Sequence, residues 1–180
     1  GYRLSLLREF GVRIRTAMIV TGTAIREYAP DFVIVATGVA PRGHPFDVSQ
    51  LAATVRVMHA WDVLRDPLLL AAAKRLTIIG GGMVGAETAD LFTLQGKQCS
   101  IIEMLGAIAS GMARNNRMEL VERLAARGTP MLTRVKVERA AGTTLTLRAD
   151  DGAARDVDAG DALIFATGPA PVRDMVPLLE

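Results

Sequence analysis

Three glycines and one glutamate have the spacing of a site that binds an adenine dinucleotide. Gly80, Gly82 and Gly85 form the pattern G-x-G-x-x-G, and Glu103 follows at about the 20-residue distance of a ribose-binding acid. The first glycine allows a tight turn, the second leaves room for a pyrophosphate, and the third lets a helix pack closely on a sheet. The N–H groups and the dipole at the start of such a helix attract anions. This spacing therefore predicts dinucleotide binding.

The choice of nucleotide depends on Glu103. We expect its carboxylate to accept hydrogen bonds from the ribose hydroxyls and to repel a 2′-phosphate. The next residues, "MLGA", include no Arg or Lys. The sequence therefore favours NAD(H) over NADP(H). Two other interpretations stay open: a strand–helix turn that binds nothing, and a solvated carboxylate at a strand end.

Alternating strand and helix patterns surround this loop. "LTIIG", "QCSIIEM", "PMLTR" and "ALIFAT" indicate strands, and helices are expected after Gly82 and over "NNRMELVERLAARG". Within the second helix, Asn116 and Glu119 resemble a capping box. Its apolar face is expected to contain Met118, Val121, Leu124 and Ala125. Residues 135–159 show short alternating runs broken by turns, which predict an antiparallel meander.

The fold class follows from this order of elements. We expect an α/β fold, with a Rossmann-like three-layer nucleotide-binding domain and a β-meander, plus fragments of a second, FAD-type domain. Toward the N-terminus, the alternating run 12–17 and the continuous apolar run 32–37 also predict strands. A further short strand is expected near 55–58.

Composition excludes several classes of function. Hydrophobic residues make up 50% and charged residues 22%, as in globular proteins. The net charge is +2 and no Lys/Arg cluster interleaves with aromatic residues, so nucleic acid is not an expected partner. The single Cys99 excludes an internal disulfide and is expected to be a buried thiol. No apolar run reaches the ~20 residues of a membrane span, and no secretory signal is present, so we expect a cytoplasmic protein with no membrane partner.

A repeated phrase points to a family. "DFVIVATGVAPR" begins at Asp31, and "DALIFATGPAPVR" begins at Asp161. Together with "GGGMVGAETADLFTLQGKQCSIIEM" and "IASGMARNNRMELVERLAARG", these segments resemble the C-terminal FAD/NAD(P)-binding region of the old-yellow-enzyme-related iron–sulfur flavoproteins. That group includes 2-enoate reductase, 2,4-dienoyl-CoA reductase and trimethylamine dehydrogenase. The resemblance implies a disulfide-reductase-like fold with two dinucleotide-binding domains.

The resemblance also implies a domain organisation. Residues 1–38 would be the tail of the first half of an FAD-type domain, and 39–71 a connector. Residues 72–160 would form the NAD(P)-binding domain, and 161–180 would return to the FAD-type domain. The FAD-binding loop, the barrel that holds FMN and the iron–sulfur cysteines would lie outside this chain. We therefore expect an excised piece that is inactive alone and self-associates through its truncated face.

The site residues implied by the motif and the resemblance gather around the glycine loop. They are Gly80, Gly81, Gly82, Met83, Val84, Gly85, Glu87, Glu103, Ala166, Thr167 and Gly168. By resemblance, Glu87 would orient the nicotinamide, although it could equally be a surface glutamate. The final "GPAPVR" departs from the family's G-R-x-P-N. His44 and His59 have no partner at recognisable spacing, so no catalytic residue and no metal ligand is assigned.

Three hypotheses about function remain in competition. In the first, the intact protein passes hydride from NADH to FAD, and electrons then pass through an iron–sulfur centre to FMN and an enoate or enoyl-CoA substrate. In the second, the region holds ADP structurally, as the resemblance to trimethylamine dehydrogenase allows. The third, a methyltransferase-like nucleotide domain, is disfavoured by the two Ala-Thr-Gly segments.

Overall fold

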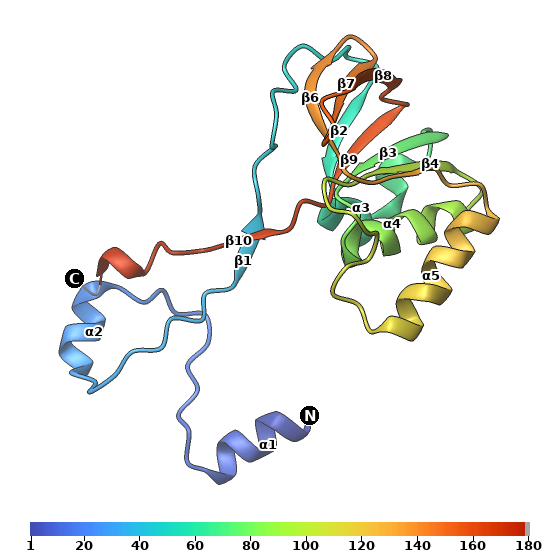
Figure 1. Ribbon diagram of the computed structural model, residues 1–180. Coiled ribbons are helices and arrows are strands. Elements are labelled where there is room, and N and C mark those ends of the chain that lie inside the picture. Colours follow the sequence, from blue (N-terminus) through green and yellow to red (C-terminus); the bar gives the residue numbers. More distant parts are fainter. Residues whose placement is uncertain (179–180) are drawn as a thin grey trace. The chain divides into compact units, whose positions relative to one another are not determined.

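The chain divides into two compact units. The computed structural model describes residues 1–178 (Figure 1). Unit 1 is formed by Gly1–Gly38 and the residues from Pro171 onward, and unit 2 is Val39–Ala170. The predicted dinucleotide-binding residues all belong to unit 2.

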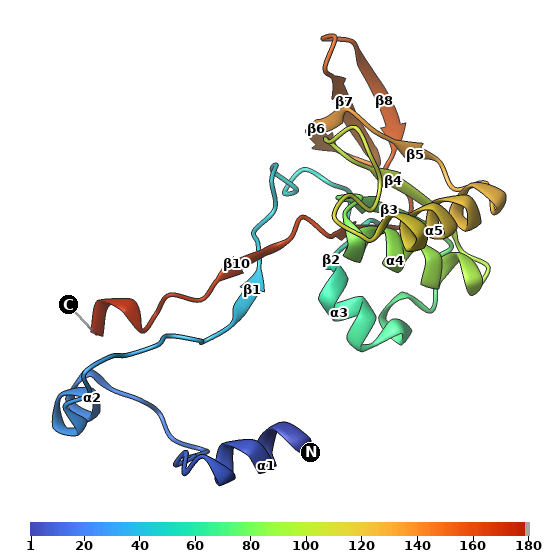
Figure 2. The same cartoon turned by 60° about the horizontal axis from the view of Figure 1, so that its bottom comes forward.

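Unit 2 is built on a five-stranded parallel sheet in the order β2-β9-β3-β4-β5. The strands are β2 (Arg56–His59), β3 (Arg75–Ile79), β4 (Gln98–Ile102), β5 (Met131–Leu132) and β9 (Ala162–Phe165). One face is covered by α3 (Ala60–Arg65), η1 (Pro67–Leu70), α4 (Met83–Leu94) and α5 (Arg114–Ala126). The antiparallel meander β6 (Val135–Ala141), β7 (Thr144–Ala149) and β8 (Ala154–Asp158) covers the other. Figure 2 shows the helices and the meander on opposite sides of the sheet.

The hydrophobic core forms two layers because side chains alternate across a strand. Ile78 packs with residues of the helices, whereas the neighbouring Ile79 packs with residues of the meander. In the same way Ile164 faces the helices and Leu163 faces the meander. These runs are apolar at every position because both faces of the sheet are covered. The three-layer, Rossmann-like α/β fold expected from the sequence is therefore confirmed.

The start and the buried face of α5 differ from the prediction. The helix begins at Arg114, its N-cap is Ala113, and no side chain caps it. Asn116 and Glu119 thus lie inside the helix, so the predicted capping box was wrong. Leu120 and Leu124 are its buried residues, whereas Met118 is 49% exposed. Of the expected face, Leu124 is buried and Val121 is partly buried against the same core, as predicted, whereas Ala125 is exposed like Met118 and the buried Leu120 was missed.

The structure also groups residues differently from the domain boundaries expected from the sequence. The expected connector 39–71 contains β2, and the expected return segment contains β9. The strand β9 lies between β2 and β3 and hydrogen-bonds to both. Residues 39–71 and residues 161–170 therefore belong to unit 2, because pairing in the sheet holds them there, whereas the residues from Pro171 onward belong to unit 1.

Unit 1 contains helices α1 (Tyr2–Glu9) and α2 (Gly22–Tyr28) and the 3₁₀ turn η2 (Val176–Leu178). The strands predicted at 12–17 and 32–37 are not formed. A strand needs a hydrogen-bonding neighbour, and the described residues provide none for these two runs. Their side chains are correspondingly open: Phe32 is 90% exposed and Ile34 is 91% exposed.

The two copies of the repeated phrase pair through the short segments that follow their Ala-Thr-Gly residues. The short strand β1 (Val39–Pro41) pairs with β10 (Pro169–Pro171). In unit 2 the N–H of Arg42 donates to the carbonyl of Gly168. In unit 1 the N–H of Val172 donates to the carbonyl of Gly38. The repetition therefore serves to pair the two segments where the chain leaves and re-enters unit 1.

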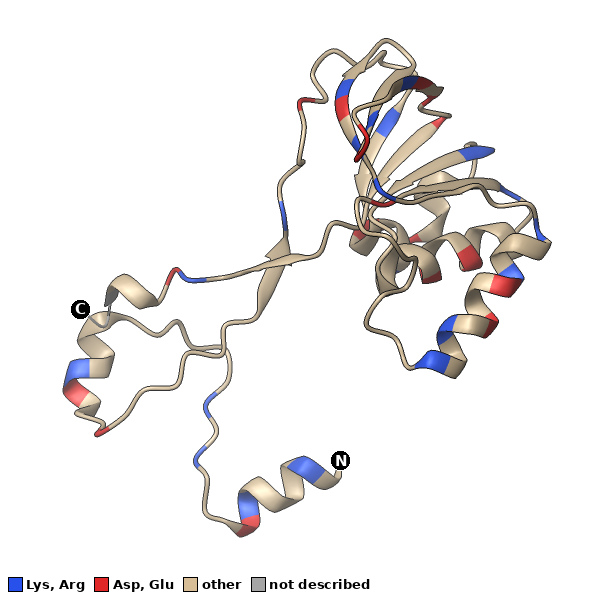
Figure 3. Ribbon diagram, viewed as in Figure 1, with Lys and Arg blue, Asp and Glu red and all other residues tan. Residues whose placement is uncertain are grey.

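Charged residues of both signs are interspersed over the surface of unit 2, and α5 carries both (Figure 3). None of the helices within residues 1–178 has both the length and the apolar character that crossing a membrane requires. Local pairs join neighbouring elements: Asp90 of α4 accepts from Arg123 and Arg127 at the end of α5. The Arg123 hydrogen bond is the main cause that holds the pKa of Asp90 below its usual range.

Candidate functional site

A cleft of about 640 Å³ lies at the carboxyl edge of the sheet in unit 2. The cleft is lined by the loops after β3, β4 and β9, by β6 and by residues of the 42–46 segment. Of the residues predicted from sequence, those that line the cleft are Gly80, Gly82, Met83, Val84, Glu103, Ala166, Thr167 and Gly168. In open α/β sheets, this edge is where ligands bind.

The glycine loop turns sharply out of β3. Gly80 has a φ of +99°, and a Cβ there would lie 2.6 Å from the carbonyl oxygen of Ala166. The turn is held by the N–H of Gly80, which donates to Ile102, and by the N–H of Ala166, which donates to Ile79. Only glycine fits this position, because both the conformation and the close approach exclude a side chain.

Gly82 has the opposite surroundings. It is the N-cap of α4, and a Cβ added to it would meet nothing within 4 Å. No side chain caps the helix, so the first N–H groups of α4 face the cleft without a capping oxygen. The fold itself does not need glycine here. The open space beside a helix N-terminus is suited to an anion such as a pyrophosphate.

Gly81 and Gly85 support the loop from behind rather than line the cleft. A Cβ on Gly85 would lie 1.8 Å from the carbonyl oxygen of Gly80, so the first turn of α4 rests directly on the strand–helix turn. The carbonyl of Gly81 accepts from the N–H of Ala109, and its own N–H donates to Glu103. Both glycines therefore hold the shape of the loop.

Glu103 is a buried carboxylate that is held by backbone amides. It is 6% exposed. Its Oε2 accepts from the N–H of Gly81 at 2.6 Å, and its Oε1 accepts from the N–H of Leu105 at 2.6 Å. An ionised carboxylate has about four acceptor positions, so capacity remains for ribose hydroxyls. The alternative of a solvated strand-end carboxylate is excluded by this burial.

Sequence reasoning missed two cationic residues of the cleft, Arg42 and Lys136. The N–H of Arg42 donates to Gly168, which places it at the Thr167 end. Lys136 follows Val135, whose N–H donates to the carbonyl of Glu103 at 3.2 Å. No local motif signals either residue, because the fold brings them to the cleft from distant parts of the chain.

Glu87 does not line the cleft. It is exposed and borders a separate groove that α4 and α5 form together with Asp90, Asn116 and Arg123. Glu87 lies one helical turn beyond Met83 and Val84, and a turn advances about 5.4 Å along the helix. Its predicted role at a nicotinamide stays a prediction that this geometry does not support.

Two histidines stack at the other end of the carboxyl edge. The ring of His44 lies 4.4 Å from that of Phe165 and 5.3 Å from that of His59, measured between centroids. His44 is exposed, and the slight desolvation of its stacked ring, followed by the charge of the neighbouring His59, lowers its pKa below the usual value. Phe46 also packs on Phe165, with centroids 5.4 Å apart. The histidines therefore hold the 42–46 segment against the sheet as one wall of the cleft.

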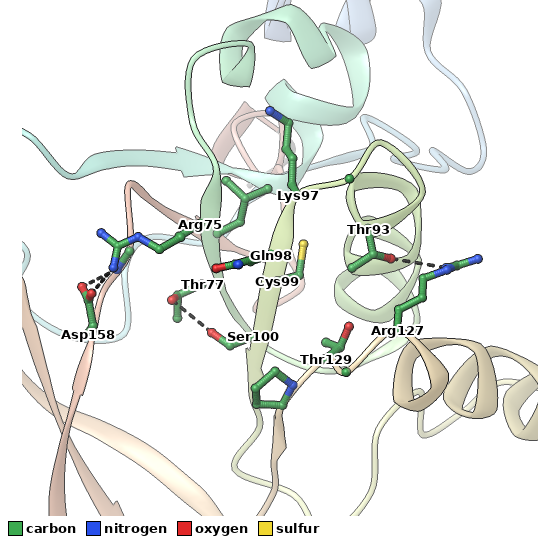
Figure 4. Close-up of a pocket in the computed structure, with 15 residues that line it drawn as sticks. Arg75, Thr77, Thr93, Lys97, Gln98, Cys99, Ser100, Arg127, Thr129 and Asp158 are labelled. Carbon is green, nitrogen blue, oxygen red and sulfur yellow. Dashed lines mark hydrogen bonds and ion pairs between the residues drawn. The ribbon is translucent and has the colours of Figure 1, made fainter.

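A second pocket, of about 560 Å³, lies at the amino edge of the sheet (Figure 4). Its charged groups are already paired: Arg75 with Asp158, and Arg127 with Asp90. Lys97 donates to the carbonyls of Leu70 and Ala73. Its cations are thus engaged by the protein, unlike Lys136 in the cleft.

The chain is similar to known oxidoreductases. Residues 5–177 match the family described as pyridine nucleotide-disulphide oxidoreductase. A 116-residue stretch is 33% identical to an NADH oxidase of Thermoanaerobacter brockii, covering 64% of this chain and 18% of the relative. A 99-residue stretch is 34% identical to a cinnamate reductase of Clostridium sporogenes, covering 55% of this chain and 14% of the relative.

A solved structure of similar fold is a 2-naphthoyl-CoA reductase in complex with 2-naphthoyl-CoA. Its TM-score is 0.69 at 18% identity, over 99% of this chain and 26% of that chain. This likeness supports the fold. The chain spans about a quarter or less of the length of each of these three proteins.

Proposed function

The chain belongs to the pyridine nucleotide-disulphide oxidoreductase family, and from that membership we propose that its carboxyl-edge cleft binds NADH for transfer of hydride to FAD. Members of this enzyme family are oxidoreductases that use FAD and NAD(H). The resemblance to flavoproteins of the 2-enoate reductase type is confirmed. The observation that carries the proposal is Gly82, whose missing side chain leaves open space at the start of α4 although the fold does not require it.

The residues of the cleft fit the parts of a dinucleotide in order. The N-terminal turn of α4 would hold the pyrophosphate, with Gly82 giving the phosphates access to the backbone N–H groups. Glu103, fixed by two amides, would accept from the adenosine ribose. The nicotinamide half would then extend toward Thr167 and Gly168 at the far end. On this basis we propose NAD(H) rather than NADP(H) as the preferred nucleotide.

The bound nucleotide would supply a hydride, and the flavin would accept it. The chain's own contribution is binding and orientation. The cleft is walled by apolar side chains, among them Phe46, Val135 and Val137, which limit the access of water to a bound nucleotide. We assign no proton-transfer residue in this chain.

The whole protein that contains this region is proposed to be an enoate or enoyl-CoA reductase. Support comes from the names of two similar proteins, a cinnamate reductase and a 2-naphthoyl-CoA reductase, which indicate unsaturated carboxylic substrates for those proteins. FMN and an iron–sulfur centre would then lie outside residues 1–180, and so would the loop that binds FAD. We also propose the cytoplasm as its compartment.

A second candidate is a structural ADP-binding module. The features that favour it are Gly82 and Glu103, which serve only the ADP half of a dinucleotide. Calorimetric titration with NADH, NAD⁺, NADPH, ADP-ribose and ADP separates the two. We expect NADH to bind more tightly than ADP-ribose, because the cleft continues to Gly168. A chain that bound ADP as tightly as NADH would support the structural module, and a chain that bound neither would remove both.

The apolar residues of unit 1 lead to a proposal about partners. Phe32, Ile34 and Ile19 are each at least 88% exposed. Exposed apolar patches of this kind mark interfaces. We propose that the remaining FAD-type half of the longer protein covers them and that the isolated chain self-associates. Light scattering across a concentration series tests this: a chain that stays monomeric would contradict it, and Phe32→Ser with Ile34→Ser should lower the association.

A further inference from the structure

We propose that Lys136 binds a phosphate at the 2′ position of the adenosine ribose, so that the cleft accepts NADPH alongside NADH. This inference rests on the proposed function of the cleft and concerns its specificity. The sequence favours NADH because Glu103 repels a 2′-phosphate and the following "MLGA" holds no cation. The structure supplies a cation from a different element, the first strand of the meander.

The position of Lys136 is set by backbone pairing with the segment that carries Glu103. The N–H of Val135 donates to the carbonyl of Glu103 at 3.2 Å, and the N–H of Arg134 donates to the carbonyl of Leu105 at 3.1 Å. On β6, Val135 is buried and the next residue, Lys136, is exposed. Lys136 lines the same cleft as Glu103. It therefore lies at the ribose end, where Glu103 is the acidic residue.

The ammonium of Lys136 is available to a ligand, whereas the neighbouring cations are engaged. Within residues 1–178, none of the ion pairs involves Lys136. Its cross-strand neighbour Arg148 pairs with Glu138 at 2.7 Å. Arg134 makes only an exposed contact of 3.8 Å with Asp150, and it does not line the cleft. Arg42, the other cation of the cleft, lies at the Gly168 end.

Glu103 and Lys136 would then divide the recognition of the ribose between them. The carboxylate is buried and fixed by two amides, so it presents an acceptor to a 2′-hydroxyl without moving. The lysine has a long flexible stem and makes no ion pair with the described residues, so it can turn toward a phosphate or remain in solvent. NADH gains little from Lys136, whereas NADPH gains a counter-charge that offsets the repulsion by Glu103.

The test compares Lys136→Ala with Arg139→Ala in binding NADH and NADPH. Arg139 is exposed on the same strand, makes no ion pair within residues 1–178 and does not line the cleft, so its removal changes the net charge equally. We expect Lys136→Ala to weaken NADPH roughly fivefold, as for an ion pair in partial contact with solvent, and NADH by less than about twofold. Arg139→Ala should leave the ratio of the two affinities unchanged, and Lys136→Arg should keep most of the NADPH affinity.

Three results would overturn the inference. These are an equal loss for both nucleotides, which indicates a contact with the pyrophosphate, an unchanged NADPH affinity, or wild-type protein that binds NADH but not NADPH. The proposed function fails by a different result, namely wild-type protein that binds no NADH. The effect of Lys136→Ala on NADPH should also shrink between low salt and about 0.5 M salt, because a partly exposed ion pair is screened.

Discussion

The backbone N–H of Gly81 donates a 2.6 Å hydrogen bond to Oε2 of Glu103. This bond joins the two halves of the nucleotide-binding motif, the glycine loop after β3 and the acidic residue after β4. The same carboxylate also accepts from Leu105. Glu103 therefore stabilises the glycine loop and is also the expected acceptor for a ribose. The first role predicts an effect on stability, and the second predicts an effect on nucleotide affinity.

Glu103→Ala should lower both stability and NADH affinity. The buried amide of Gly81 and the partly buried amide of Leu105 would lose a charged acceptor, which is expected to cost about 2–3 kcal/mol in the free energy of unfolding. NADH affinity should fall more than NADPH affinity, because a hydrogen-bond acceptor and a repulsive charge disappear together. Urea unfolding and nucleotide titration measure the two effects. An unchanged NADPH:NADH preference would show that Glu103 does not contact the ribose.

Gly82→Val should abolish binding while the protein stays folded. A Cβ at this position meets no protein atom within 4 Å, so we expect the free energy of unfolding to change by no more than about 1 kcal/mol. The branched side chain would instead fill the space beside the N-terminus of α4, and NADH affinity should fall at least roughly tenfold. Calorimetry on the folded variant tests this. Wild-type affinity in Gly82→Val would mean that the pyrophosphate does not pass over Gly82.

Gly85→Ala should mainly lower the free energy of unfolding, in contrast to Gly82→Val, which should mainly lower NADH affinity. The added methyl group would lie 1.8 Å from the carbonyl oxygen of Gly80, so α4 must move away from the turn. Overpacking of this kind is expected to cost about 3 kcal/mol. Thermal or urea unfolding measures the loss, and Gly82→Ala is the matched control. Equal stability of the two alanine variants would contradict the packing described here.

Cys99 should be inert in the folded protein. Its side chain is 5% exposed, and burial raises the pKa of its thiol to about 12. At pH 8 the thiolate population would be roughly a thousandfold lower than for a free cysteine. A colorimetric thiol reagent should therefore react with Cys99 only after denaturant is added. Rapid reaction under native conditions would show that the sheet opens around Cys99 of β4.

The free energy of unfolding should fall slightly at mildly acidic pH through His44, which is exposed, so that solvent weakens the effect. Its folded pKa lies below the usual 6.5, so just below pH 6.5 the unfolded chain binds more protons than the folded one. The contribution of His44 to the free energy of unfolding is therefore complete above about pH 6.5, and it is lost as the pH falls toward the pKa of His44 in the folded protein. An NMR titration of the His44 ring measures this pKa directly, and His44→Gln should flatten the pH dependence of unfolding between pH 7 and 5. A measured pKa at or above 6.5 would contradict the stacked arrangement.

Local sequence was enough to predict the motif and the alternating elements of unit 2. Gly80, Gly82 and Gly85 mark a turn whose geometry depends on residues within a few positions of one another. The apolar runs of β3, β4 and β9 are continuous because both faces of the sheet are covered, and that pattern is readable without knowing the partners. The family resemblance drew on the same local segments.

Tertiary structure decided what depends on partners distant in the sequence. The apolar run 32–37 is as strand-like as 162–165, yet only the second forms a strand, because β9 lies between two neighbours and the first run has none among the described residues. Lys136 reaches the cleft only because β6 begins beside the end of β4. Hydrogen bonds between segments that are distant in the sequence place Lys136 in the same cleft as Glu103. The spacing of residues along the chain does not predict those hydrogen bonds.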